Sequence, residues 1–201
     1  MKSACLFLLL ALPLYAQESH NGLGFAVGQL SGIGFSYRHL PKENGFQVSF
    51  GVLSLHREDG TDIYYEHNDD DRGNQYAQSM FQSERGRESH ANVGVLVFRV
   101  LHDAKRSRFY ALAGVSFFYA STEYSDQEYR MGEEGMYYYE PYGNPVKRVE
   151  RENTLYGGLG IGIEVKFTTN IRAALEWPLT YSSKGDLVMY YPQVGLHYFF
   201  K

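Results

Sequence analysis

Cysteine is almost absent from this chain. Its 201 residues include one cysteine, Cys5, which lies in an apolar run near the N-terminus, at residues 4–14. Without Cys5 the rest of the chain has no thiol, which excludes disulfides and thiolate metal sites there. This absence suits an exported protein, which meets an oxidising compartment.

Long apolar runs are also missing beyond the N-terminus. Residues 4–14 follow the basic start Met1-Lys2-Ser3, and the small residue Ala16 comes shortly after them. Because the run is too short to span a bilayer comfortably, this order predicts a secretory signal peptide over residues 1–16. An N-terminal anchor helix is the alternative. No break in composition divides residues 17–201, so we expect them to form a single domain.

Positive charge is in deficit as well. The formal net charge is -4, which argues against a nucleic-acid partner. A mean hydropathy of -0.38 does not exclude a membrane protein, because barrel strands interleave polar residues with apolar ones. The abundant residues, 18 Tyr and 21 Gly, suit strands, turns and interfacial aromatic rings.

The stretch 157–167 shows the clearest pattern in the chain. Apolar side chains alternate there with glycine or charge, so a strand would place them on opposite faces. An apolar outer face with small or charged residues on the inner face is typical of a transmembrane barrel strand. The residues predicted to face lipid are Leu159, Ile161, Ile163, Val165 and Phe167.

Similar two-faced segments recur along the chain. They lie at residues 23–28, 33–38, 46–52, 93–97, 109–119, 157–167, 171–177 and 187–200. Together they predict an all-β protein, an eight-stranded antiparallel up-and-down transmembrane β-barrel. The long polar segments 56–90 and 121–153 are predicted loops at one end, and the connections at the other end are short. This asymmetry is typical of bacterial outer-membrane barrels, whose long loops are extracellular.

Several charged residues fall on the predicted inner face. An eight-stranded barrel is just wide enough to be filled by side chains, so these charges must pair. We expect a salt-bridge plug that occludes the lumen, and a gated ion path is the alternative. The residues are Arg38, Glu164, Lys166, Arg172 and Glu176.

The two predicted loops carry candidate binding residues. The second loop contains several tyrosines among acidic residues, and tyrosine is a common anchor of binding surfaces. These form a candidate partner-binding loop for an extracellular ligand: Tyr124, Tyr129, Tyr137, Tyr138, Tyr139 and Tyr142. The first loop contains the acidic run Asp69-Asp70-Asp71, which lacks the full series of a calcium loop. We expect no metal and no cofactor.

The signal peptide, the eight alternating segments and the aromatic-rich last strand resemble the small outer-membrane β-barrel family of the outer-membrane protein A and X type. The resemblance covers nearly all of residues 17–201. It implies a bacterial outer-membrane location, with outer-membrane lipid and the barrel-assembly machinery as partners. It also implies that Tyr198 and Phe200 in the last strand serve as the assembly signal.

A non-enzymatic structural or surface-interaction role follows from this interpretation. One alternative is a soluble lipocalin-like barrel, with its apolar face turned inward around a ligand. Another is a lipid acyl hydrolase or transferase in the outer membrane. Such deacylase barrels pair His and Ser two residues apart on one strand face, and no histidine here has a serine two positions downstream.

Overall fold

The computed structural model describes residues 20–56, 61–67, 78–131, 139–189 and 191–200. The predicted signal peptide lies outside these ranges. None of the described residues forms a helix long and apolar enough to cross a membrane. The ten strands are β1 (Asn21–Gly28), β2 (Gly32–His39), β3 (Asn44–His56), β4 (Thr61–His67), β5 (Gln78–Asp103), β6 (Ser107–Met131), β7 (Tyr139–Lys166), β8 (Ile171–Ser182), β9 (Leu187–Val188) and β10 (Gln193–Phe200).

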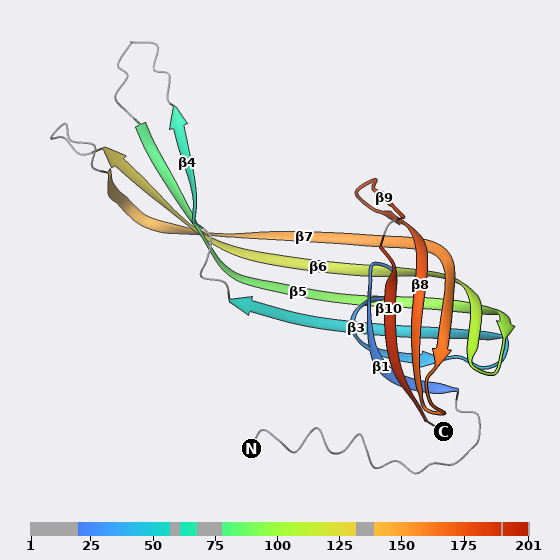
Figure 1. The fold of residues 1–201 in the computed structure, drawn as a ribbon. Helices are drawn as coiled ribbons and strands as arrows, with labels where there is room; N and C mark the ends of the chain where they lie inside the picture. The colour runs from blue at the N-terminus through green and yellow to red at the C-terminus, as the bar shows by residue number, and fades with distance from the viewer. Residues whose placement is uncertain (1–19, 57–60, 68–77, 132–138, 190, 201) are drawn as a thin grey trace, which may run out of the picture.

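Eight of these strands close into a barrel (Figure 1). They follow the order β1, β2, β3, β5, β6, β7, β8 and β10, each antiparallel to the next, and β10 returns to pair with β1. Closure leaves no open edge within the ring, because every barrel strand has a neighbour on both sides. The predicted eight-stranded antiparallel barrel is confirmed.

The connections differ between the two ends of the barrel. At one end, which we call the turn end, β2–β3, β5–β6 and β7–β8 are joined by residues 40–43, 104–106 and 167–170. The other end, the arm end, carries the longer connections between β3 and β5, β6 and β7, and β8 and β10. The free ends of the first and last strands lie at the turn end, where Asn21 pairs with Phe200.

The last predicted strand, residues 187–200, is broken in the structure. It divides into the two-residue β9 and the eight-residue β10. Pro192 directly precedes β10, and a proline cannot donate a ladder hydrogen bond. The strand that closes the barrel therefore begins one residue after it.

The long polar segments 56–90 and 121–153 were predicted to be loops, and this prediction is wrong for much of their described parts. Strands β5, β6 and β7 continue through them as one paired sheet. β4 adds to that sheet by pairing with β5, from Thr61 opposite Glu84 to His67 opposite Gln78. Strand pairing satisfies the backbone polar groups even where both faces of a sheet meet water, so hydropathy alternation is not needed.

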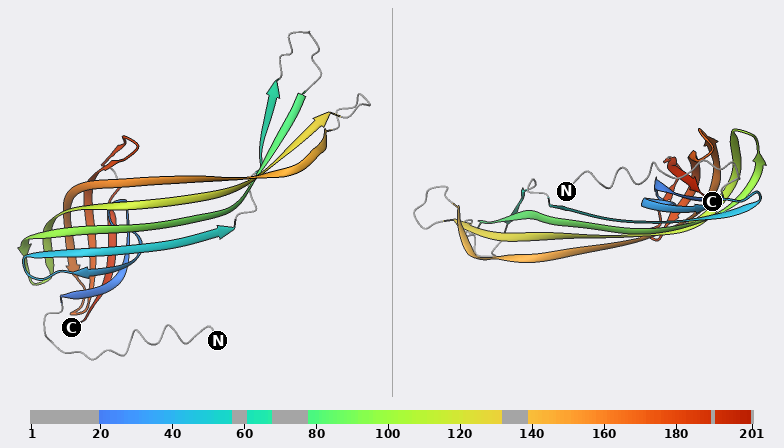
Figure 2. Two further views of the ribbon diagram at one scale, coloured as in Figure 1. Left: turned by 180° about the vertical axis from the view of Figure 1, so that it is seen from behind. Right: turned by 90° about the horizontal axis from the view of Figure 1, so that it is seen from below.

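We call this extension the arm. It consists of β4 and the arm-end parts of β3, β5, β6 and β7, and Figure 2 shows it projecting well beyond the barrel in both views. β5, β6 and β7 contain 26, 25 and 28 residues, whereas a transmembrane strand needs about 9–11. More than half of each of these strands thus lies outside the barrel wall.

Glycines on the inner face of β7 let neighbouring strands approach closely. A Cβ atom on Gly160 would overlap the carbonyl oxygen of Trp177 on β8 and lie 2.6 Å from the Cα of Pro178. Both neighbours are backbone atoms, so they cannot move aside cheaply. Gly157, on the outer face, has no such neighbour, since the nearest atom is Val115 Cγ1 at 4.0 Å.

We therefore expect Gly160→Ala to destabilise the folded barrel by about 1–3 kcal/mol, the usual cost of overpacking. Gly157→Ala, three residues away on the same strand, should leave the stability nearly unchanged. Equilibrium urea unfolding of both variants in the same detergent measures the difference. Equal unfolding midpoints would contradict the close approach of β7 and β8.

Candidate functional site

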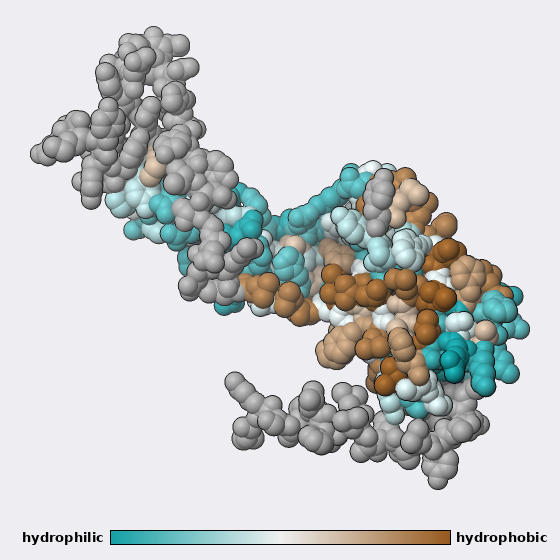
Figure 3. All heavy atoms as spheres, in the orientation of Figure 1, coloured by the Kyte–Doolittle hydropathy of each residue, from teal (hydrophilic) through white to brown (hydrophobic). Residues whose placement is uncertain are grey.

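The outer surface of the barrel is apolar. On β1, Leu23, Phe25 and Val27 alternate with inward residues and are about half exposed. Aromatic rings continue the surface across neighbouring strands, with the Phe25 and Phe35 ring centroids 4.5 Å apart and those of Phe35 and Phe50 6.1 Å apart. Figure 3 shows this apolar surface over the barrel and a hydrophilic arm. Exposed side chains of this kind need a non-aqueous neighbour.

The residues predicted to face lipid all lie on this outer surface. Their exposed fractions range from 38% for Val165 to 68% for Phe167. Phe167 directly follows the last residue of β7. Glu164, between two of them, is 1% exposed and points into the barrel. The full set is Leu159, Ile161, Ile163, Val165 and Phe167.

Arg38 on β2 is the centre of a polar network in the lumen. Its side chain is 1% exposed and forms an ion pair with Glu176 of β8 through Nη2. A second ion pair joins Nη1 to Glu164 of β7 at 3.5 Å. Nε donates a hydrogen bond of 2.7 Å to Gln47, and the guanidinium lies 4.6 Å from the ring centroid of Phe98. One cation thus links four different strands across the barrel.

The carboxylates of the network have further donors. Glu176 accepts hydrogen bonds from the Tyr110 hydroxyl at 2.7 Å and from Gln193 Nε2 at 2.6 Å. Glu164 accepts one from Arg172 Nη1 at 3.3 Å, and the Arg172 guanidinium lies 3.9 Å from the ring centroid of Phe199. Because these charged groups are paired and hydrogen-bonded, their burial does not leave an isolated charge.

Lys166 lies apart from this network, at the turn end. Its Nζ is 3.0 Å from Asp103 Oδ1 and 3.3 Å from the carbonyl oxygen of Ala104. Asp103 also pairs with Arg108 Nε at 3.0 Å. Burial raises the pKa of the Asp103 carboxyl, but hydrogen bonds and charge from Arg108 and Lys166 outweigh this and hold the pKa below its usual value. Lys166, Asp103 and Arg108 therefore form a cluster of paired charges at the turn end of the barrel.

The turn between β1 and β2 closes the arm end of the lumen. Leu30 and Ser31 are fully buried, and the turn bonds to several barrel strands. Gln193 accepts from Ser31 N at 3.0 Å, Thr180 donates to Gln29 Oε1 at 3.0 Å, and Ser49 donates to the Ser31 carbonyl oxygen. This turn, residues 29–31, therefore acts as a plug at the arm end of the lumen.

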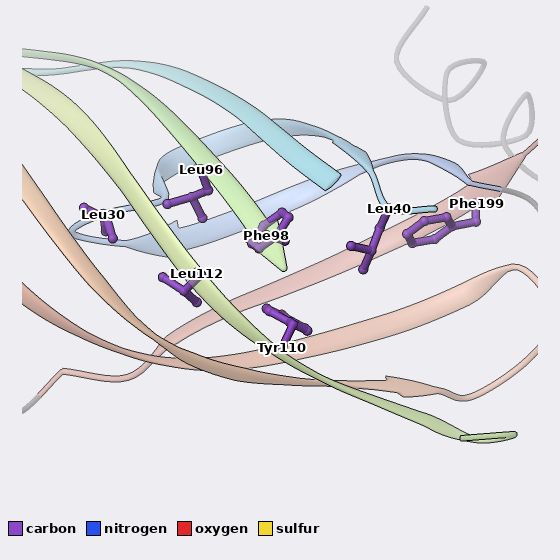
Figure 4. Close-up of a cluster of buried hydrophobic side chains, with 7 residues drawn as sticks. All are labelled: Leu30, Leu40, Leu96, Phe98, Tyr110, Leu112 and Phe199. Carbon is purple, nitrogen blue, oxygen red and sulfur yellow. The ribbon is translucent and has the colours of Figure 1, made fainter. Parts of the chain in front are cut away.

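Apolar side chains fill the space that the polar network leaves. Figure 4 shows Leu30, Leu96 and Leu112 near one another, Phe98 beside Tyr110, and Leu40 beside Phe199. The rings of Phe98 and Tyr110 meet edge to face, with centroids 5.1 Å apart. The cluster extends from the plug to the turn end, so buried side chains lie along the inside of the ring between its two ends.

Several lumen residues were not among the predicted ones. Arg108 and Tyr110 on β6, Gln47 on β3, and Gln193 and His197 on β10 are all at most 1% exposed. Arg108 was not predicted to face the lumen because β6 begins at Ser107, two residues before the predicted strand 109–119. The alternation itself would have found the others, since each occupies the inner face of its strand.

The structure contains a buried contact between serine and histidine. Ser36 Oγ lies 2.9 Å from His197 Nε2, and both residues are at most 2% exposed inside the lumen. His90 and Ser89 are consecutive on β5 and face opposite sides of the sheet. Among the described residues, no group of three or more His, Cys, Asp or Glu side chains could hold a metal ion.

The candidate binding tyrosines belong to the arm where they are described. Tyr124 and Tyr129 lie on β6, and Tyr139 and Tyr142 lie on β7. Tyr124 lies between two cations, 5.9 Å from the Arg85 guanidinium and 4.9 Å from that of Arg148. Tyr142 is 52% exposed. Tyr137, Tyr138 and the acidic run 69–71 lie outside the described residues.

Tyr198 and Phe200 alternate with buried residues on β10. Both are partly exposed, while Phe199 between them is fully buried. They lie on the outer face at the turn end, opposite Leu23 and Asn21 of β1. The structure therefore places them side by side on the outer surface of the closing strand.

We expect Arg38→Ala to cost about 3–5 kcal/mol of folding free energy, because it leaves Glu176 buried with no cation partner and Glu164 with Arg172 alone. Arg99→Ala is the matched control. Arg99 pairs with Glu43 at 3.8 Å, and both side chains are more than half exposed, so its loss should cost less than about 1 kcal/mol. Urea unfolding in detergent measures both, and similar costs would contradict the central role of Arg38.

No protein-family model matches the chain, and no curated protein matches it either. Among solved structures, the chain is similar to the crystal structure of CarO2 from Acinetobacter baumannii. The two are 11% identical, with a TM-score of 0.36, and the match covers 92% of this chain and 100% of that one. A similarity of this size carries no argument about function.

Proposed function

We propose that this protein is an outer-membrane β-barrel with an occluded lumen, which presents the arm outside the cell for interaction. The observation that carries the proposal is the apolar outer surface of a closed barrel whose interior is polar and charged. A protein in water buries its apolar face, whereas a protein in lipid exposes it. The orientation here is the reverse of the one that a soluble lipocalin-like barrel requires.

The dimensions of the short strands support a membrane location. β1, β2 and β10 contain 8 residues each and β8 contains 12, close to the 9–11 or so that cross a bilayer at the usual tilt. Exposed aromatic residues lie near both ends of the barrel, with Phe46 and Phe167 toward the turn end and Tyr181 and Tyr191 toward the arm end. Such residues favour the level of the lipid headgroups.

The short connections and the free strand ends favour an orientation in which the turn end faces the periplasm. In bacterial barrels the short turns face the periplasm and the long connections face outward. The arm then lies outside the cell. In this orientation Tyr198 and Phe200 lie at the periplasmic rim, where the barrel-assembly machinery would meet an assembly signal.

Because the lumen is occluded in this proposal, we assign the interaction with a partner to the arm. β7 pairs with β8 only from Tyr156 to Lys166, so its arm portion has an open edge. Ser183 N donates to the Leu155 carbonyl oxygen at 2.8 Å, and Ser183 Oγ accepts from Leu155 N at 3.2 Å. From Leu155 outward to Lys147, every second residue therefore directs its backbone N–H and C=O groups to the open edge. An open edge is a template for an extended partner segment.

The single tryptophan offers a direct test of lipid contact. Trp177 lies on the outer face of β8 and is 49% exposed. In vesicles of phosphatidylcholine with brominated acyl chains, we expect its fluorescence to be strongly quenched relative to unbrominated vesicles. Unchanged fluorescence in protein that has folded and co-floats with the vesicles would overturn the proposed lipid-facing surface.

The orientation can be tested on intact cells with single cysteines. Asn144→Cys is on the exposed arm portion of β7, and Thr169→Cys is in the turn between β7 and β8. We expect a membrane-impermeant maleimide to label Asn144→Cys on whole cells and Thr169→Cys only after lysis. The wild-type chain, whose Cys5 lies in the predicted signal peptide, provides the blank. The reverse pattern would contradict an extracellular arm.

A further inference from the structure

A groove of about 720 Å³ lies in the corner between the arm and the outer wall of the barrel. Its barrel side consists of β1 and β2, and its arm side consists of β3, β5, β6 and β7. Figures 1 and 2 show why this corner exists, since the long strands run past the short β1 and β2 rather than ending level with them. Its volume is within the range of about 300–1,000 Å³ typical of small-molecule sites.

The barrel side of the groove belongs to the apolar outer surface. Phe25, Ile33 and Phe35 line it, with exposed fractions of 55%, 49% and 58%. The same residues form part of the surface that faces acyl chains in the proposed function. The groove is therefore continuous with the lipid-facing surface of the barrel, and a lipid could enter it without leaving the membrane.

The arm side of the groove is the lumen-facing side of the long strands, continued beyond the barrel. On β6, Ser116 faces the lumen and Phe118 and Ala120 follow on the same face. Ala120 pairs with His90 of β5, and His90 pairs with Leu53 of β3. Leu53 is 53% exposed. The face that carries paired charge inside the barrel thus becomes partly apolar where it overhangs the outer wall.

Polar groups gather on the arm side and at the mouth of the barrel. The Asn92 side chain is fixed there, since its Oδ1 accepts from Ile33 N at 2.7 Å and its Nδ2 donates to the Ile33 carbonyl oxygen at 2.9 Å. Glu152, paired with Lys184, and His90, whose side chain is 47% exposed, also line the groove, on β7 and β5 on either side of Ala120. The groove thus offers an apolar wall and a polar end, which matches the two parts of an amphiphile.

We propose that this groove binds one phospholipid molecule of the membrane. Its acyl chain lies against Phe25, Ile33, Phe35 and Phe118, and its headgroup lies beside His90 and Glu152. The proposal rests on the proposed function, because the lipid reaches the groove along the lipid-facing surface. The arm would then both protrude from the membrane and hold a lipid at its base.

Two substitutions on neighbouring residues of β6 test the proposal. Ala120→Phe places a ring into the groove, whereas Ser121→Phe places the same ring on the opposite face of the strand. Each protein is reconstituted in phosphatidylethanolamine vesicles, extracted into detergent and analysed by native mass spectrometry. We expect the wild-type protein and Ser121→Phe to retain one lipid and Ala120→Phe to lose it. Equal retention by all three, or none by the wild type, would overturn the proposal.

A second pair of variants distinguishes loss of the lipid site from misfolding of Ala120→Phe. Leu53→Gln removes apolar surface from the groove without adding volume, and we expect it to lose the lipid as well. Leu55→Gln is its control, because Leu55 lies on the same face of β3 but one row further along the arm, outside the groove lining. Loss of the lipid from both glutamine variants would show general weakening of the arm and would count against the groove.

Quenching of Trp177 by brominated lipid, measured on the same preparations, separates this proposal from the one on which it rests. Trp177 lies on β8 and is absent from the groove lining. Quenched Trp177 with no difference in lipid retention between the variants would overturn the groove alone. Unquenched Trp177 in the folded proteins would overturn both proposals.

Discussion

The ion pairs of Arg38 with Glu176 and Glu164 are the interaction on which the barrel depends. Three charges from three strands are buried in a space too narrow for water to solvate them freely. Each must find its partner across the lumen, and those partners exist only when the ring is closed. The network therefore couples closure of the barrel to the register of its strands. A one-residue slip of β8 would turn Glu176 outward and bring Trp177 or Leu175 inside.

The same constraint explains why the barrel surface is apolar and its arm is not. Inside the ring, charge and glycine occupy the inner face, so the apolar half of each strand faces outward. Beyond the ring neither face is enclosed, and most described residues from Pro141 to Asn153 on β7 are exposed and polar. The arm is held together by backbone pairing and by contacts such as Arg148 with Asp126 at 3.2 Å. The enclosed part of the barrel ends, and the arm begins, at the level of the buried plug residues Leu30 and Ser31.

The arm end of the barrel is closed by its own first turn, rather than by a separate domain. The plug uses the left-handed backbone of Gly32, whose φ is +76°, to fold Leu30 and Ser31 into the ring. A side chain there would also meet Asn92, which holds the end of β2. The plug and the barrel side of the groove are consequently parts of a single hairpin, β1 and β2 with the turn between them.

Strict alternation in the sequence determined the strands, their inner and outer faces and hence the eight-stranded ring, because side-chain direction in a strand follows position alone. It also identified Arg38, Glu164, Arg172 and Glu176 as inward residues. It missed Arg108, which lies just outside the predicted strand, and it assigned to the lumen Lys166, which pairs at the rim. Only the tertiary structure decided that the polar segments continue as paired strands, since backbone pairing in a two-sided polar sheet leaves no trace in hydropathy. It alone showed that the first turn folds inward and that the overhanging arm makes a groove with β1 and β2, because both depend on the tilt and closure of distant strands.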